Sequence, residues 1–213
     1  YLGDDAGASF TVGNDGNTGV GIGALSSGNS ASYSTAFGAL ALNDGDADAN
    51  TAFGFHALMG VTSGRMNVGL GREAIGGAGL NAAIGNTAAG DSAGYGLNGS
   101  SHNVAVGAST LSLSAGGEGN IAVGYGAMMQ TGGGSYNIAI GSSAYSSPSG
   151  NFNVGIGYDS LGKQDTGEYN IGIGTSALNN NSANSQNIAI GYQALRDISG
   201  LDYNLAVGAN ALY

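Results

Sequence analysis

Residues 187–195 read N-I-A-I-G-Y-Q-A-L, and this nine-residue phrase decides the fold of the chain. Close copies lie at residues 120–128, 137–145, 170–178 and 204–212, and the phrase recurs twelve times in all, after a truncated copy at the front. Numbered from zero at Asn, it has Gly at position four, Ala at seven and Leu at eight. Self-similarity at a fixed period is the signature of a solenoid, in which each repeat forms one layer. The sequence therefore predicts an all-β, parallel β-solenoid.

The glycines at position four set the period. They are Gly3, Gly21, Gly38, Gly54, Gly71, Gly85, Gly107, Gly124, Gly141, Gly157, Gly174, Gly191 and Gly208. Most neighbours in this series are 16 to 18 residues apart, so we expect coils of about 17 residues and about 13 coils. The copy at residues 81–89 gives intervals of 14 and 22 residues around Gly85, and we interpret residues 90–95 as a displaced loop. Because the two intervals together make about two periods, we predict one domain over residues 1–213.

Large and small side chains alternate at the start of each phrase. Position two is Ala or Gly in every full copy, and positions one and three are almost always branched or aromatic. This alternation is typical of a strand whose two faces have different neighbours. We expect the branched residues to fill the coil and the small residues to lie against another backbone, because nothing larger than a methyl group is accepted. Gly at position four indicates a bend, and positions seven and eight predict a second short strand.

Asparagine occupies position zero in eleven copies, with Ser34 in the remaining one. Stacked coils place equivalent side chains above one another at ~4.8 Å. Amide groups at that spacing can donate to and accept from their neighbours. We therefore predict an asparagine ladder, with a ligand-contact role for these residues as the alternative.

The predicted coil has a thin interior. The apolar surface buried there barely offsets the conformational entropy that its residues lose on folding. A small-residue face with nothing large to bury then suggests a partner chain. We expect three identical chains, intertwined or side by side around a threefold axis. At ~4.8 Å per layer, about 13 layers make a rod on the order of 60 Å long.

Composition excludes several classes of function. The chain has four Lys and Arg residues against 14 Asp and Glu, a net charge of −10, and no Cys. Nucleic acids and anionic membranes need clustered cations, so neither is an expected partner. No apolar run approaches the ~18 residues that span a bilayer, and disulfides do not hold the fold together. The chain begins at Tyr1 rather than Met, so we expect a segment processed or cut from a longer protein.

The phrase N-[I/V]-A-[I/V]-G-x-x-A resembles the head repeat of YadA-type trimeric autotransporter adhesins, whose coils form a left-handed parallel β-roll assembled as a trimer. The variant N-I-A-I-G-Y-Q-A-L is also similar to repeats of phage tail fibres and fibre-like bacterial surface proteins, many of which carry a downstream intramolecular chaperone of the endosialidase type. The resemblance covers residues 2–212. It implies a left-handed β-roll, trimerisation, an extracellular location and adhesion.

Candidates for metal or catalytic chemistry are few. Asp44, Asp46 and Asp48 alternate in one turn, a spacing that can wrap Ca²⁺, but the Gly and Glu of an EF-hand loop are missing. We expect a solvated acidic turn, with Ca²⁺ as the alternative and no other cofactor. His56 and His102 lie far apart in the sequence, and the acidic residues form no recurring pair. We therefore expect no enzyme.

Aromatic residues are the better candidates for contact with a partner. Phe55, Tyr125, Tyr158 and Tyr192 share position five, directly after the Gly. Five more precede position zero: Tyr33, Tyr136, Phe152, Tyr169 and Tyr203. Exposed aromatic side chains suit contact with a glycan or a protein. The alternative is that they cover coil ends or the seam between chains.

The sequence thus predicts a non-enzymatic structural and adhesive segment of an extracellular trimeric fibre, from a bacterial surface or a phage tail, that binds a host surface or glycan. One alternative is a subunit that stacks into filaments without binding a receptor. Another is an ice-binding solenoid, which needs a regular Thr column, whereas Thr occupies position one only at Thr18, Thr35 and Thr51. A spike that hydrolyses glycans would need paired carboxylates.

Overall fold

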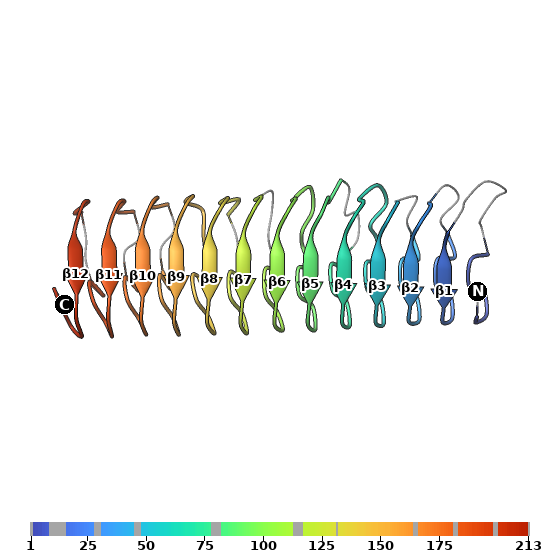
Figure 1. The fold of residues 1–213 in the computed structure, drawn as a ribbon, viewed down its shortest axis with the longest axis horizontal. Coiled ribbons are helices and arrows are strands. Elements are labelled where there is room, and N and C mark those ends of the chain that lie inside the picture. Colours follow the sequence, from blue (N-terminus) through green and yellow to red (C-terminus); the bar gives the residue numbers. More distant parts are fainter. Residues whose placement is uncertain are drawn as a thin grey trace.

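The computed structural model describes residues 2–8, 16–27, 31–44, 48–77, 82–112, 117–130, 132–163, 166–180, 183–197 and 200–212. Within these ranges there is no helix, and all the strands belong to one sheet. The coils stack in sequence order along a rod, with every strand pointing the same way (Figure 1). After each strand the chain turns back and runs to the start of the next strand, which begins the next layer of the rod (Figure 1).

In the described part of the chain, twelve parallel strands of three residues each pair with their sequence neighbours. They are β1 (Thr18–Val20), β2 (Thr35–Phe37), β3 (Thr51–Phe53), β4 (Val68–Leu70), β5 (Thr87–Ala89), β6 (Val104–Val106), β7 (Ile121–Val123), β8 (Ile138–Ile140), β9 (Val154–Ile156), β10 (Ile171–Ile173), β11 (Ile188–Ile190) and β12 (Leu205–Val207). Leu2 extends the sheet through an isolated bridge to Val20. The all-β parallel solenoid with coils of about 17 residues is confirmed.

The predicted register of the copy at residues 81–89 is wrong. Strand β5 begins at Thr87, so Asn86 occupies position zero and Gly90 provides the bend. Gly85 instead precedes position zero, with a φ of 67°. Residues 86–90 also match the phrase. The chain adopts this second register because the Asn86 side chain then forms hydrogen bonds with the asparagines of the coils before and after it. Residues 90–95 are therefore an ordinary coil segment, and the extra residues fall in the preceding turn.

The predicted orientation of the strand is also wrong. The middle residue of every strand is buried, and the branched residues on either side are half-buried or exposed. In β8, Ala139 is 0% exposed while Ile140 is 40% exposed. The position-two side chain points into its own coil, where the opposite wall lies close: a Cβ added at Gly69 would lie 2.9 Å from the Ala74 carbonyl oxygen. Ala or Gly is required by that wall and not by a partner chain.

The second wall is a run of turns rather than the predicted strand. Positions six and eight adopt left-handed backbone conformations, as at Ser143 and Tyr145, with φ near 50°. Hydrogen bonds between coils still hold this wall: the Leu178 N–H donates to the Ala194 carbonyl at 3.1 Å, and the Leu161 N–H to the Ala177 carbonyl at 2.9 Å. The core is therefore Ala from the strand packed against Ala and Leu from the turns.

The coil around Gly94 shows how the core is completed where the phrase fails. Gly94 occupies position eight, which is Leu in most copies, and so leaves a gap. Leu97 is fully buried, and a Cβ at Gly94 would lie 2.7 Å from its Cδ1 atom. Leu97, three residues after Gly94, thus fills the space that the Leu of position eight fills in other coils.

The predicted asparagine ladder is confirmed. The side chain of Asn67 accepts the backbone N–H of Asn86 at 2.9 Å and donates through Nδ2 to the Ala83 carbonyl at 2.8 Å and to Asn50 Oδ1 at 3.2 Å. Equivalent bonds recur in the coils that follow, and most of these asparagines are fully buried. The ladder satisfies turn backbone groups, so the alternative of ligand contact is wrong for these buried residues.

Candidate functional site

Exposed side chains form columns along the rod, because equivalent residues of successive coils lie one layer apart. Three columns are defined by their position in the phrase: the sheet face at positions one and three, the position-five column, and the minus-one column just before position zero. The residue types within a column decide what surface it presents.

The sheet face is uncharged along its whole length and mostly apolar. Positions one and three of β1 to β12 carry only Val, Ile, Leu, Phe, Thr or Ala, without one charged residue. Phe37 and Phe53 stack there with ring centroids 4.7 Å apart. Twelve strands at ~4.8 Å make a continuous face more than 50 Å long. Monomeric proteins rarely expose so long an apolar surface.

The position-five column contains the four predicted contact residues. Tyr125, Tyr158 and Tyr192 follow the bends after β7, β9 and β11, and Phe55 follows the bend after β3. All four are exposed. The three tyrosines lie on alternate coils, with Ser142 and Thr175 at the same position of the coils between them. Phe55 is separated from this group and stacks on His56, with ring centroids 3.8 Å apart.

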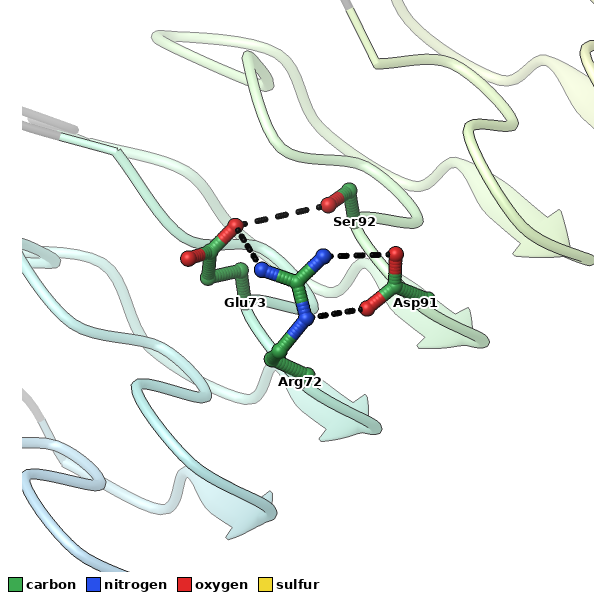
Figure 2. Close-up of polar contacts among 4 residues, drawn as sticks. All are labelled: Arg72, Glu73, Asp91 and Ser92. Carbon is green, nitrogen blue, oxygen red and sulfur yellow. Dashed lines mark hydrogen bonds and ion pairs between the residues drawn. The ribbon is translucent and has the colours of Figure 1, made fainter.

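Charged residues occupy the position-five column between Phe55 and the tyrosines. Arg72 and Asp91 lie at position five of adjacent coils, with Glu73 and Ser92 beside them (Figure 2). The Arg72 guanidinium donates from Nε to Asp91 Oδ1 at 2.6 Å and from Nη2 to Oδ2 at 2.8 Å. Glu73 Oε2 lies 3.1 Å from Arg72 Nη1 and accepts the Ser92 hydroxyl at 3.4 Å.

This cluster links two coils but offers little chemistry. The hydrogen bond and the charge of Asp91 raise the pKa of Arg72, so the guanidinium stays charged at any working pH. Solvent screens the network because Arg72 and Asp91 are about half exposed, and such pairs contribute little to stability. With its cation already paired, the cluster is best described as a cross-link on the rod surface.

Three aromatic residues of the minus-one column stack on one another within the chain. Tyr136 stacks on Phe152 at 5.4 Å, and Phe152 stacks on Tyr169 at 5.1 Å, both with nearly parallel planes. Glu118 accepts the Tyr136 hydroxyl at 2.5 Å, and this bond, with the negative charge of Glu118, raises the pKa of Tyr136. Tyr33 and Tyr203 are the most exposed members.

The candidate metal residues are only partly within the described ranges. Asp46 lies outside them, and Asp48 Oδ1 accepts the Ser32 N–H at 2.7 Å, so one carboxylate caps the neighbouring coil. Across the described ranges, no three His, Asp or Glu side chains are grouped as a metal site would require. The Ca²⁺ alternative for Asp44, Asp46 and Asp48 stays a prediction.

The two histidines belong to different columns. His56 lies at position six, and its Nε2 atom is buried without a hydrogen-bond partner in the described part of the chain. His102 lies in the minus-one column over Gly85, where an added Cβ would lie 3.1 Å from its ring. The structure does not bring them together. The corrected register adds Thr87 to the threonines of position one, but Val68 interrupts that series.

A second polar ladder was not predicted from the sequence. It runs two residues before position zero, where a side chain caps the backbone of the preceding coil. Asn151 Oδ1 accepts the Ser135 N–H at 2.9 Å, and Ser185 Oγ accepts the Glu168 N–H at 3.1 Å. Apart from Arg65 and Ile84, which interrupt the ladder, the residues at this position are Ser, Asn, Asp or Glu, so the signal was a recurrence of polar character rather than of one residue type.

Comparisons of the chain with protein-family models, with curated proteins and with solved structures find no match. Within the described residues, no helix has the length and apolar character needed to cross a membrane.

Proposed function

We propose that this chain is a rigid structural and adhesive segment of an extracellular fibre built from three identical chains, on a bacterial surface or a phage tail. The observation that carries the proposal is the sheet face, which is uncharged from β1 to β12 and carries only apolar side chains from β6 to β12. In water such a face is stabilised by burial against a partner.

A second copy of the same chain is the partner that fits this face. The face repeats every layer, so only a surface with the same period can match it over its length. Three copies around one axis give each face a matching partner and close the assembly, which prevents open-ended growth through that face. The resemblance of the repeated phrase to trimeric adhesin heads supports the same number of chains in the assembly.

Sedimentation equilibrium of the 213-residue chain tests the proposal. We expect a single species of three times 20.6 kDa at micromolar concentration. The double variant Val123→Asp/Ile140→Asp places two charges on the sheet face and should sediment as the single chain. Thr175→Asp adds a charge outside the face and serves as the matched control, which should keep the native mass.

Two outcomes would overturn the trimer. A folded native chain that sediments as a monomer would show that the sheet face needs no partner. Light scattering from rods that lengthen with concentration would instead support the alternative of a filament subunit. The adhesive part of the proposal depends on the position-five column and is tested separately below.

A further inference from the structure

We propose that the tyrosines of the position-five column form a ladder that binds a linear, uncharged polysaccharide along the rod. The ladder consists of Tyr125, Tyr158 and Tyr192. This inference rests on the fibre function proposed above and names the ligand class of its adhesive surface.

The ring faces of these tyrosines are free. The side chains of Tyr125, Tyr158 and Tyr192 are 65%, 59% and 51% exposed, and none has a hydrogen-bond or ring partner in the described part of the chain. In the minus-one column, by contrast, the rings of Tyr136, Phe152 and Tyr169 lie on adjacent coils and stack on one another. A sugar packs its C–H face on an aromatic face, and in the position-five column unstacked tyrosine rings recur on alternate coils to provide such faces in series.

The spacing of the rings suits a linear repeating ligand. Ser142 and Thr175 separate the tyrosines, so successive rings lie two layers, or ~9.6 Å, apart along the rod. With only Ser or Thr at position five of the next coil, each tyrosine has no neighbouring ring to stack on and its face is available to a sugar. An extended β-linked glycan repeats its ring orientation once per disaccharide, a distance comparable with this step. The three tyrosines then span about four layers, or ~19 Å.

The backbone around the column disfavours a peptide ligand. A peptide that adds to a sheet needs free N–H and C=O groups. Here the Ser143 N–H donates to the Tyr125 carbonyl, and the Ser176 N–H donates to the Tyr158 carbonyl, both at 2.9 Å. The Gln193 N–H donates to Thr175 in the same way. What remains for a ligand is ring faces with flanking hydroxyl and amide groups, which suit sugar hydroxyls.

The charge of the chain selects a neutral glycan. Position five carries no charged residue from Ala108 to Ala209, and the chain has a net charge of −10. An acidic polysaccharide would be repelled along the whole rod, and Arg72, at position five three coils before Tyr125, is already paired with Asp91.

Calorimetric titration with defined oligosaccharides tests the ladder. The probes are cellohexaose, xylohexaose and mannohexaose, with cellobiose as the short comparison. We expect the native chain to bind at least one hexasaccharide tenfold or more tightly than cellobiose, because only a long chain reaches several rings. Tyr125→Ala/Tyr158→Ala/Tyr192→Ala should lose binding. Tyr33→Ala/Tyr203→Ala removes exposed tyrosines from the minus-one column and should bind as the native chain does.

A gap-filling variant separates a ladder from general stickiness. Ser142→Tyr/Thr175→Tyr adds two rings, yet it should lose binding because rings on adjacent coils stack on one another, as Tyr136 and Phe152 do, and no longer turn a face outward to a sugar chain. Ser142→Ala/Thr175→Ala keeps the gaps and should retain affinity. Circular dichroism of each variant confirms that the coil is folded.

Three results would overturn the ladder: no hexasaccharide binds the native chain, the triple tyrosine variant binds equally well, or the gap-filled variant binds more tightly. A triple variant that falls from trimer to monomer would assign the column to chain association instead. A native trimer that binds none of the probes rejects the ladder alone, whereas a native monomer rejects the fibre proposal.

Discussion

At the scale of single residues, the coil depends on left-handed backbone at four positions. In one coil these are Tyr136, Gly141, Ser143 and Tyr145, all with positive φ. Left-handed backbone costs a residue with a side chain roughly 1–2 kcal/mol. The N–H groups offset this by bonding to both neighbouring layers: Ser143 donates to Tyr125, and Tyr145 donates to Ser160. Stacking therefore supports a conformation that Tyr or Leu rarely adopts alone.

The position-four glycine is predicted to be irreplaceable because neighbouring bends touch. A Cβ at Gly141 would lie 2.5 Å from the Gly157 carbonyl oxygen, at a φ of 135°. Gly141→Ala should lower the free energy of unfolding by more than about 4 kcal/mol. Gly126→Ala is the matched control. Gly126 has a φ of 63° and a Cβ added there would have nothing within 4 Å, so this substitution should lower the free energy of unfolding by only about 1–2 kcal/mol. Urea denaturation compares them, and equal losses would contradict the role of contact between layers.

The Glu118–Tyr136 hydrogen bond predicts a pH effect. Because the bond raises the folded-state pKa of Tyr136 above 10.0, its stabilisation is complete below pH 10 and is lost as pH rises through the raised pKa. Glu118→Gln removes the charge and should lower the pKa of Tyr136. Ultraviolet difference titration of each protein against its Tyr136→Phe counterpart isolates this phenol. Identical midpoints with Glu and Gln would show that the bond does not form in solution.

At the scale of one coil, two thin walls face each other. The strand contributes Ala or Gly, and the turns contribute Ala and Leu. Where the turn residue is larger, the coil adapts: the buried Tyr145 hydroxyl accepts Asn153 Nδ2 at 2.8 Å. Each layer buries little apolar surface, so stability comes from many layers and from hydrogen bonds between them.

The orientation of the strand can be tested by enlarging its middle residue. Ala139 is fully buried against the turn wall, so Ala139→Val should overpack the coil and cost about 1–3 kcal/mol. Thr175→Val changes an exposed residue and should stay within about 0.5 kcal/mol of the native free energy of unfolding. Denaturation midpoints give both values. A negligible effect of Ala139→Val would mean that the small residue faces outward after all.

At the scale of the whole molecule, the rod is nearly one-dimensional, because each described strand contacts the strands next to it in the sequence (Figure 1). Whole coils should therefore be removable. Residues 137–169 make two coils, and their deletion joins Tyr136 to Asn170. This junction is a Tyr followed by an Asn, like Tyr169 and Asn170 in the native chain, so the register is kept. We expect a folded rod shorter by about 10 Å, measured by small-angle scattering.

A deletion out of register provides the control. Removing residues 137–160 cuts one and a half coils and joins Tyr136 to Leu161, so the ladder loses its alignment at the junction. This variant should show a clear loss of β-structure by circular dichroism. If both deletions fold equally well, the coils are less dependent on register than the stacked asparagines imply.

The sequence determined the features that every layer needs from one kind of residue. Asn at position zero and Gly at position four recur because a single side chain, or its absence, satisfies the same contact in each coil. Period, parallel stacking, the asparagine ladder and the alignment of Tyr125, Tyr158 and Tyr192 followed from that recurrence.

Only the tertiary structure decided the rest. Alternation distinguishes two faces but not which one is inside, and that depended on the turn wall opposite Ala139. Residues 81–85 and 86–90 both fit the phrase, and the hydrogen bonds of Asn86 to its neighbours selected the second. Whether an aromatic face is free depends on what the adjacent coil places beside it, which is why Tyr136 stacks within the chain and Tyr158 does not.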